Sequence, residues 1–427
     1  MAVETATALL LNAPSNLEFG IDLNVWKTGP KFKGLKMITP GIHFIYYSLS
    51  STNSNQISFR SGFWHDFTAN ELLVKLWDIS IEDFIQETNL DQLERYRFSN
   101  QCFNRSDLKE FDAFLGAYPQ ISISDQNIDT FVKWKQQTSC ITVRLLDQIL
   151  PCKNISAMCS VSRHSEVWNE SKIADLAKLN ISSQLANLNI TDDSEMRSKS
   201  QEDVSENWMN FTVIDLKRSF PPGSTASEIT FYSLDKSYLL DLTISQNYYE
   251  PKELIGELQL CFLMLHLGQI YDAFEQWKLI FHLICTSNQA IARHLEIYNL
   301  FLETAFCHLQ EFPADFFINE RNSENFIRDG IMMLKENLES VQAPLSFALN
   351  SQKLSRLVQF VDLKFDWDIA HNVTDMDGMD DDYLPTVVDE NHCQVTGNTL
   401  VNMINDDESF DELEGYRFTS LETITEE

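Results

Sequence analysis

The sequence predicts an α+β protein in which a β-rich domain of the sandwich or barrel type precedes an α-helical domain and an acidic tail. Three observations lead to this prediction. Short aromatic and β-branched runs separated by turns fill the first 150 residues, helix-spaced apolar residues dominate the second half, and residues 366–427 hold 18 acidic side chains against one arginine. We therefore expect a β-rich domain at 1–150, a Ser/Asn-rich flexible connector at 151–210, a helical domain at 211–372 and a largely disordered tail at 373–427.

Turn residues divide the N-terminal part into runs of strand length. Asn-Ala-Pro at 12–14, Thr-Gly-Pro at 28–30 and Thr-Pro-Gly at 39–41 separate them, which predicts strands at residues 19–26, 31–38 and 42–49. Pro40-Gly41 suits the centre of a type II turn. In a regular strand Lys31 and Lys33 would share one face and Phe32 the other.

Helical patterns are strongest further along the chain. Residues 90–115 have helix-like apolar spacing, whereas 151–209 show no strong period and at most one weak helix at 172–188. Residues 253–285 predict two apolar helices separated near Gly268, and further helices are expected at 290–309, 324–341 and 346–364. Helices this apolar need neighbours on several sides. A compact antiparallel domain meets that need, and no fixed-period repeat is visible.

Composition limits the classes of function. The formal net charge is −31, the N-terminus carries no basic signal region and no bilayer-length apolar run, and the eight cysteines form no CxxC pair. We expect no membrane anchor, and a protein with reduced thiols in the cytoplasm and nucleus. Four lysines lie in residues 26–47, but they are too few against −31 to predict sequence-specific binding of nucleic acid.

No catalytic, cofactor or metal motif stands out. The chain has no Walker A loop, GxGxxG, GxSxG or HExxH pattern. His65 and Asp66 are neighbours, but adjacent strand residues point to opposite faces and need not meet. The histidines of the helical domain lack the spacing of a helix-borne metal site, and the acidic run at 375–382 lacks a calcium-loop register. We expect a protein that is not an enzyme and holds no cofactor or metal.

One short segment of the tail differs from its surroundings. An apolar, β-prone island lies between acidic runs, and such an island can add a strand to the sheet edge of another protein. It consists of Leu384, Pro385, Thr386, Val387, Val388 and Asp389.

Several stretches resemble one known family. "EFGIDLNVWKTGPKFKGLKMITPGIHFIYYS" at residues 18–48 closely resembles the N-terminal signature of the Aar-two family, the A-one cistron splicing factors. "IGELQ" at 255–259, "LGQIYDAFEQWK" at 267–278, "EFPADFF" at 311–317 and "KFDWDI" at 364–369 are similar to its helical domain. The similar parts span about 18–150 and 225–369, while the connector at 151–209 and the acidic continuation after Glu390 depart from the family pattern.

The resemblance implies a fold and a function. Family members have an N-terminal β domain joined to a helical domain that resembles the VHS superhelix. They are assembly factors for the U-five small nuclear ribonucleoprotein, they bind the RNase H-like and endonuclease-like domains of the scaffold Prp-eight, and they delay the helicase Brr-two. The alternative is a VHS-type trafficking adaptor, although fold analogy alone assigns no function.

The resemblance also implies roles for individual residues. A structural signature that fixes the strand connections and the helical core would comprise Gly20, Asp22, Trp26, Gly29, Pro30, Gly34, Pro40, Gly41 and Trp277. Asp315, Phe316 and Phe317 are candidates for a surface anchor, because aromatic side chains beside a turn can fill a pocket of a partner. Residues 384–389 are expected to add a strand to the scaffold, as C-terminal extensions of some family members do.

Overall fold

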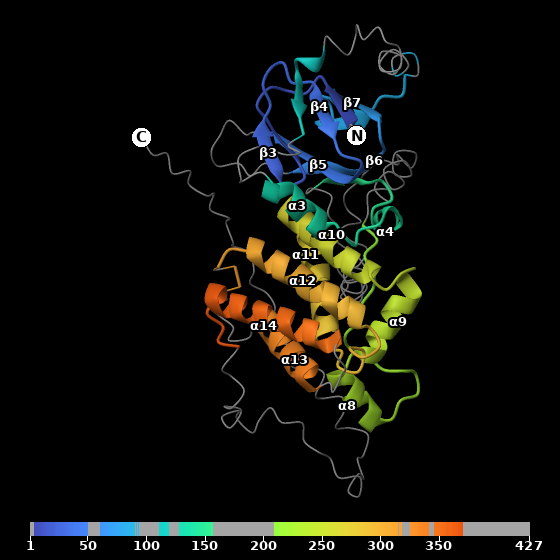
Figure 1. Ribbon diagram of the computed structural model, residues 1–427. Coiled ribbons are helices and arrows are strands. Elements are labelled where there is room, and N and C mark those ends of the chain that lie inside the picture. Colours follow the sequence, from blue (N-terminus) through green and yellow to red (C-terminus); the bar gives the residue numbers. More distant parts are fainter. Residues whose placement is uncertain are drawn as a thin grey trace, which may run out of the picture. The chain divides into compact units, whose positions relative to one another are not determined.

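The computed structural model describes residues 4–49, 60–89, 91, 93, 111–118, 128–156, 209–314, 316–317, 325–340 and 346–369. Its N-terminal part contains two five-stranded sheets (Figure 1). The first sheet has the order β8-β7-β1-β4-β9, with strands Asp83–Gln86, Leu72–Asp78, Ala6–Leu11, Gly34–Ile38 and Leu115–Ala117. The second has the order β10-β6-β5-β2-β3, with strands Asn154–Ser156, Ser61–Phe67, Gly41–Leu49, Leu17–Ile21 and Asn24–Lys27.

The two sheets share one hydrophobic core, as in a sandwich. Ala8 and Leu10 of β1 lie in the same buried cluster as Phe19 of β2 and Ile45 of β5. The first sheet is mixed, since β1 pairs parallel with β7 and antiparallel with β4. The second sheet is antiparallel throughout. The predicted β-sheet domain is therefore present.

Several predicted strands and one helix differ in detail. Residues 19–26 form a hairpin rather than one strand, because the chain turns between β2 and β3. Residues 31–33 precede β4, so the predicted alternation of Lys31 and Lys33 along a strand is wrong. Leu115, expected at the end of a helix, lies in β9 beside Gly34. Three residues of the predicted connector form β10, which pairs with β6.

The helices follow in chain order. Two of them, α3 (Ile128–Gln137) and α4 (Val143–Ile149), precede β10. The C-terminal region contains α8 (Ala226–Leu234), α9 (Ser237–Asn247), α10 (Glu253–His266), α11 (Tyr271–Cys285), α12 (Leu295–Glu311), α13 (Phe326–Ser340) and α14 (Ser346–Phe365). The predicted pair of helices separated near Gly268 is confirmed as α10 and α11, and the three later predictions correspond to α12, α13 and α14.

α10 lies at the centre of the helical region. Its residues from Glu253 to Met264 are all buried, and the apolar ones belong to a hydrophobic cluster that also contains α3, α4, α11 and α12 residues. Burial on every side explains why its sequence is apolar around the whole helix. Phe44 and Trp64 of the second sheet belong to the same cluster, so the second sheet and the helices share this core.

Two further observations concern the cysteine side chains and the length of the helices. In the described part, Cys140, Cys261 and Cys285 are buried free thiols, Cys307 is a half-buried free thiol, and Cys152 is half-buried. No helix of the described ranges has both the length and the apolar character needed to cross a bilayer.

Candidate functional site

Residues 255–259 lie in the middle of α10 and join it to a segment that is far away in the chain. Gly256 faces the backbone of Cys140 so closely that an added Cβ atom would lie 2.3 Å from the Cys140 carbonyl oxygen. The side chain of Gln259 accepts a hydrogen bond from the Cys140 N–H at 2.9 Å and donates to the Gln136 carbonyl at 3.1 Å. α10 therefore binds the backbone between α3 and α4 directly.

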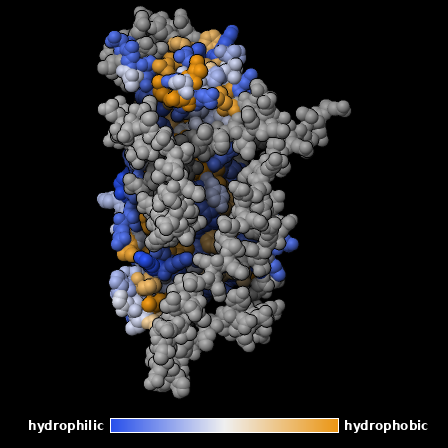
Figure 2. All heavy atoms as spheres, turned by 180° about the vertical axis from the view of Figure 1, so that it is seen from behind, coloured by the Kyte–Doolittle hydropathy of each residue, from blue (hydrophilic) through white to orange (hydrophobic). Residues whose placement is uncertain are grey.

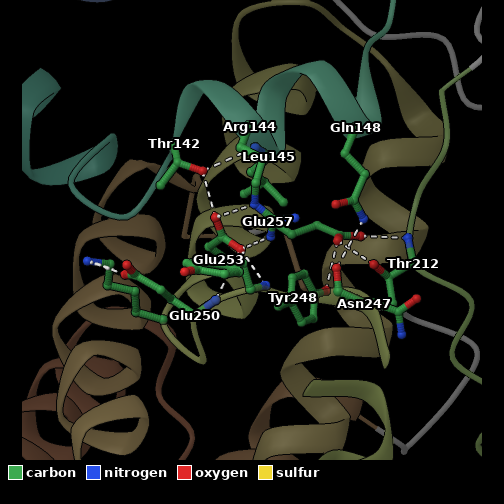
Figure 3. A network of polar contacts seen from close by, with 12 residues as sticks. Thr142, Arg144, Leu145, Gln148, Thr212, Asn247, Tyr248, Glu250, Glu253 and Glu257 are labelled. Carbon is green, nitrogen blue, oxygen red and sulfur yellow. Dashed lines mark hydrogen bonds and ion pairs between the residues drawn. The ribbon is translucent and has the colours of Figure 1, made fainter. Parts of the chain in front are cut away.

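Glu257 holds the chain at Thr212 against the same helix (Figure 3). Its carboxylate accepts hydrogen bonds from the N–H and the hydroxyl of Thr212, at 2.9 and 2.7 Å. The hydroxyl of Tyr248 and the amide of Gln276 donate to it at 2.8 and 2.9 Å. Burial raises the pKa of Glu257, and these hydrogen bonds act in the opposite direction. Four donors satisfy both oxygens of a carboxylate that has no access to water.

Glu253, one turn earlier, binds α4. It accepts a hydrogen bond from the Thr142 hydroxyl at 2.8 Å and forms an ion pair with Arg144. The N–H of Tyr249 donates to it at 2.9 Å. Burial alone would raise the pKa of Glu253, but the hydrogen bonds from Arg144, Thr142 and the backbone outweigh burial and lower it. We call Glu253, Gly256, Glu257 and Gln259 the α10 junction.

Two other motifs of the resemblance, residues 311–317 and 364–369, meet at the ends of α12 and α14. The ring of Phe317 lies edge-on to Phe365, with centroids 5.5 Å apart, and to Trp367 at 5.8 Å. Lys364 donates hydrogen bonds to two carbonyl groups of the last turn of α12. A cation at this position satisfies carbonyls that have no partner within the helix and complements the helix dipole.

Phe316 is the exposed member of this corner. Its side chain is 37% exposed, and its ring contacts Phe312 at 4.6 Å and Phe274 at 5.7 Å between centroids. Tyr271, 64% exposed, lies 6.1 Å from Phe274 on the same helix. We call Tyr271, Phe274 and Phe316 the aromatic patch. An exposed ring supported by buried rings has the arrangement of an interface anchor.

The other predicted partner-binding residues are placed differently. Phe317 is half-buried and supports the corner rather than projecting from it. Asp315 and residues 384–389 lie outside the described residues. Trp277, expected in the core, is fully buried, and its indole N–H donates to Nδ1 of His308 at 3.1 Å.

Other exposed apolar side chains lie elsewhere on the surface. The rear view in Figure 2 shows hydrophobic residues among hydrophilic ones, both over the sheets and over the lower helices. α8 contains no buried residue, and Phe231 and Leu234 are 46% and 66% exposed. On β3, Val25 is 51% exposed and Trp26 is 40% exposed. Exposed apolar groups of this kind mark candidate contact surfaces.

The N-terminal signature is organised by a buried network around Asp22. The Asp22 carboxylate accepts the Phe44 N–H at 3.0 Å and the Tyr118 hydroxyl at 2.7 Å, and it lies 2.6 Å from Nδ1 of His43. The other ring nitrogen of His43 lies 2.8 Å from the carbonyl oxygen of Thr39. The ring of His43 thus bridges Asp22 on one side and the backbone of Thr39 on the other. Asp22 and His43 are completely buried, so their arrangement serves the structure.

The remaining signature residues differ in their constraints. Gly34 has φ of 128°, and a Cβ atom there would lie 2.0 Å from the Ala8 carbonyl oxygen in the paired strand β1. Gly41, after Pro40, has φ of 125°. Both positions require glycine. A Cβ atom on Gly29 would meet nothing within 4 Å, so that position is not constrained by close packing.

Gly20 and Pro30 complete the signature. An added Cβ atom on Gly20 would meet the ring of Tyr46 at 2.2 Å, so the ring of the paired strand β5 covers this glycine. Pro30 lies in the turn that precedes β4 and is exposed. The signature thus combines close contacts between strands with turn positions at the surface.

His65 and Asp66 are not brought together as a pair. His65 Nε2 instead lies 2.6 Å from Glu71 Oε1, and the Glu71 carboxylate also accepts a hydrogen bond from the Thr68 N–H. Among the described residues no group of three or more His, Cys, Asp or Glu is placed to hold a metal ion.

Sequence reasoning missed the Asp22–His43 pair and the α10 junction. The first connects residues 21 positions apart, one in the loop after β2 and the other in β5, and no local pattern predicts such contacts. A signal for the second was present, because Glu257 and Gln259 interrupt an otherwise apolar helix. Buried polar side chains need partners, so such an interruption indicates a polar contact across the core.

Two family models match the chain: "AAR2 N-terminal domain" over residues 4–151 and "AAR2 C-terminal repeat region" over residues 211–370. The human Protein AAR2 homolog is 29% identical over 369 residues, covering 86% of this chain and 91% of the relative. The Caenorhabditis elegans Protein AAR2 homolog is 28% identical over 369 residues, covering 85% and 94%. The A1 cistron-splicing factor AAR2 of Saccharomyces cerevisiae is 25% identical over 322 residues, covering 74% and 80%. None of these descriptions names an enzyme.

Proposed function

This chain belongs to the AAR2 family of splicing factors, and from that premise we propose that it is an assembly factor for the U-five small nuclear ribonucleoprotein. It binds the C-terminal region of Prp-eight, including the RNase H-like and endonuclease-like domains, and delays the binding of Brr-two. It meets the U-five precursor in the cytoplasm and nucleus. The observation that carries this proposal is that both AAR2 domains match in order, over residues 4–151 and 211–370.

The α10 junction supports the proposal of a partner-binding protein whose N-terminal and helical parts are connected. Hydrogen bonds of Glu253 and Gln259 connect the helical region to residues 136–144, which belong to the N-terminal family domain. Arg60 adds a contact, donating to the Leu267 carbonyl at 3.0 Å and to Glu18 at 2.7 Å. A surface formed by preorganised parts loses less conformational entropy on binding than one that must be assembled. We propose that the helical part has the VHS-like superhelical arrangement of the family.

The aromatic patch is the proposed anchor of the helical part. Phe316 and Tyr271 offer large apolar areas to a partner, and the buried rings of Phe312 and Trp277 fix the patch from below. Rigid aromatic side chains lose little conformational entropy when they enter a pocket.

The tail segment is the proposed second contact. Residues 384–389 add a strand to the sheet of the scaffold, where main-chain hydrogen bonds supply affinity and alternate side chains supply specificity. Deleting residues 380–427 should therefore weaken scaffold binding. Unchanged affinity after this deletion would overturn the strand-addition proposal.

An order-of-addition experiment tests the proposed function. The full chain is incubated with the C-terminal region of Prp-eight, Brr-two is added, and the amount of Brr-two bound is measured over time. We expect slower Brr-two binding when this chain is added first, and no delay with an unrelated acidic protein of similar charge. Equally fast Brr-two binding in both reactions would contradict the proposal. The trafficking adaptor would then be the function to test.

A further inference from the structure

β3 is an edge strand that is exposed on both of its faces. It ends the strand order of the second sheet, so no strand of the described ranges pairs with its outer side (Figure 1). Val25, Trp26 and Lys27 are all exposed. A lysine on an edge discourages unwanted pairing, but here two apolar side chains stand beside it. An edge of this kind is a template for a strand that can satisfy the lysine.

The register of the hairpin determines which backbone groups face outward. The Thr28 N–H donates to the Leu17 carbonyl at 2.9 Å, so these two residues form a hydrogen-bonded pair. Such pairs alternate along an antiparallel ladder, so Val25, opposite Gly20, belongs to the other type of pair, as does Lys27. The N–H and C=O groups of Val25 and Lys27 therefore point away from β2. Within the described part of the chain, neither residue has a backbone hydrogen bond outside its own hairpin.

The two apolar side chains of β3 lie on opposite faces of the sheet. The Trp26 ring stacks on Phe19, with centroids 6.5 Å apart, at the rim of the core between the two sheets. Val25 lies on the other face, opposite Gly20. A strand added to this edge would extend the sandwich core on one face and cover Val25 on the other, so apolar burial would add to the main-chain hydrogen bonds.

The sequence around this edge is basic. Residues 23–65 contain no carboxylate, in a chain in which 63 of 427 residues are acidic. The basic residues of this stretch are Lys27, Lys31, Lys33, Lys36 and Arg60. Lys36 and Arg60 have acidic partners, whereas the other three have none among the described residues. The edge therefore favours an acidic occupant.

We propose that β3 binds an extended acidic segment of another protein by strand addition. An antiparallel orientation continues the pattern of the second sheet. From its N-terminus, the segment places a carboxylate opposite Lys27, a large apolar side chain opposite Trp26 and a β-branched side chain opposite Val25. A second copy of β3 fits less well, because it brings lysines toward lysines.

This contact goes beyond the proposed function. It is made by the N-terminal sandwich, and it involves neither the aromatic patch nor the tail. Lys27 gives the edge its selectivity, because a strand without the complementary charge leaves the lysine without a partner.

Hydrogen exchange of the full chain with a synthetic peptide tests the proposal. The probe is the peptide Glu-Glu-Asp-Leu-Val-Thr-Val, blocked at both ends. At about 20 times its dissociation constant, the amides of Val25 and Lys27 should exchange at least tenfold more slowly than in the free chain. The amide of Gln86 on β8, the edge strand of the first sheet, should stay within twofold.

A neutral peptide and two charge variants test the role of Lys27. The peptide Gln-Gln-Asn-Leu-Val-Thr-Val should bind at least fivefold more weakly than the acidic one. Because the chain as a whole repels an acidic peptide, this order can come only from local charge. Lys27→Glu should weaken binding of the acidic peptide at least fivefold. Lys217→Glu makes the same change at an exposed position of the helical part and should stay within twofold.

Equal or tighter binding of the neutral peptide would overturn the proposal, as would a lack of protection at millimolar acidic peptide. Strong protection of Val25 and Lys27 in the free chain would also contradict it, because the edge would then be occupied without a partner. Tighter binding of an oligothymidylate than of the acidic peptide would assign the lysines to nucleic acid instead. None of these results depends on Prp-eight, so this test and the test of the proposed function fail independently.

Discussion

Asp22 has a backbone conformation that most side chains avoid. Its φ is 53°, at the first position of the two-residue loop between β2 and β3, where a positive φ matches the twist of the flanking strands. The hydrogen bonds to the Phe44 N–H, His43 and Tyr118 hold it there. One residue thus fixes the hairpin, the neighbouring strand β5 and the segment after β9.

Asp22→Asn should destabilise the protein by about 3 kcal/mol, because the amide keeps the shape and the tolerance for positive φ but sets a donor against His43 and Tyr118. Urea unfolding measures the change. Glu71→Gln is the control, since its pair with His65 is partly exposed and should cost less than about 1 kcal/mol. An equal loss of stability for both substitutions would show that the buried network around Asp22 stabilises the protein no more than the partly exposed His65–Glu71 pair does.

His308 gives the helical core a dependence on pH. Burial, and then the neighbouring His266, lower the pKa of His308 from 6.5 to about 3. The unfolded chain therefore binds one more proton than the folded chain between these values. This contribution to stability is fully present above pH 6.5 and is lost as pH falls toward 3.

His308→Gln should remove this dependence while keeping an acceptor for the Trp277 indole. Between pH 7.5 and 5.5 the unaltered protein should lose about 1 kcal/mol more stability than the variant. Denaturant unfolding at the two pH values measures this difference. If both proteins lose the same stability, His308 does not titrate on unfolding as described.

At the scale of elements, Gly256 decides how closely α10 approaches the chain between α3 and α4. Gly256→Ala should cost about 2 kcal/mol, because the new Cβ atom would lie 2.3 Å from the Cys140 carbonyl oxygen and must push it away. Gly330→Ala in α13 is a matched control. Its Cβ atom would meet Phe281 at 3.4 Å, so the gain in helix propensity should leave stability equal or slightly higher. Thermal unfolding of both variants checks this, and similar melting temperatures would argue against a tight junction.

The elements also show what the sequence could and could not predict. The boundaries of α11, α13 and α14 follow local periodicity, and local patterns predicted them within a few residues. The hairpin at residues 17–27 was missed because its two-residue loop, Asp22-Leu23, lacks the glycine that usually identifies such a turn. β9 and β10 are three residues each and depend on strands far away in the chain, so no local period reveals them.

In the candidate site, some aromatic residues could be predicted from the sequence and others could not. Phe316 was predicted at the surface because an aromatic pair beside a Pro-containing turn is visible in the sequence, and its ring is partly exposed, while its role as an anchor stays a prediction. Tyr271 was missed, since its place on the same patch depends on the approach of α11 to the chain after α12. Contacts between elements decide which aromatic rings are exposed, and these contacts are set by the tertiary structure.

At the scale of the whole molecule, exposed and buried aromatic rings should have separable effects. Phe316→Ala should weaken binding to the C-terminal region of Prp-eight about tenfold or more, with little change in stability, because an exposed anchor contributes mainly to the complex. Phe312→Ala, at a buried ring of the same corner, should instead lower stability by about 3 kcal/mol. Calorimetric binding and unfolding curves for both variants distinguish the two roles. Unchanged binding for Phe316→Ala would remove the aromatic patch from the interface.

Binding of the full chain to the C-terminal region of Prp-eight can be measured directly as an isotherm at physiological salt. We expect a saturable one-to-one complex, which is weakened by Phe316→Ala and left intact by Gly330→Ala. Absence of a complex would contradict the proposed role of this chain as a Prp-eight assembly factor.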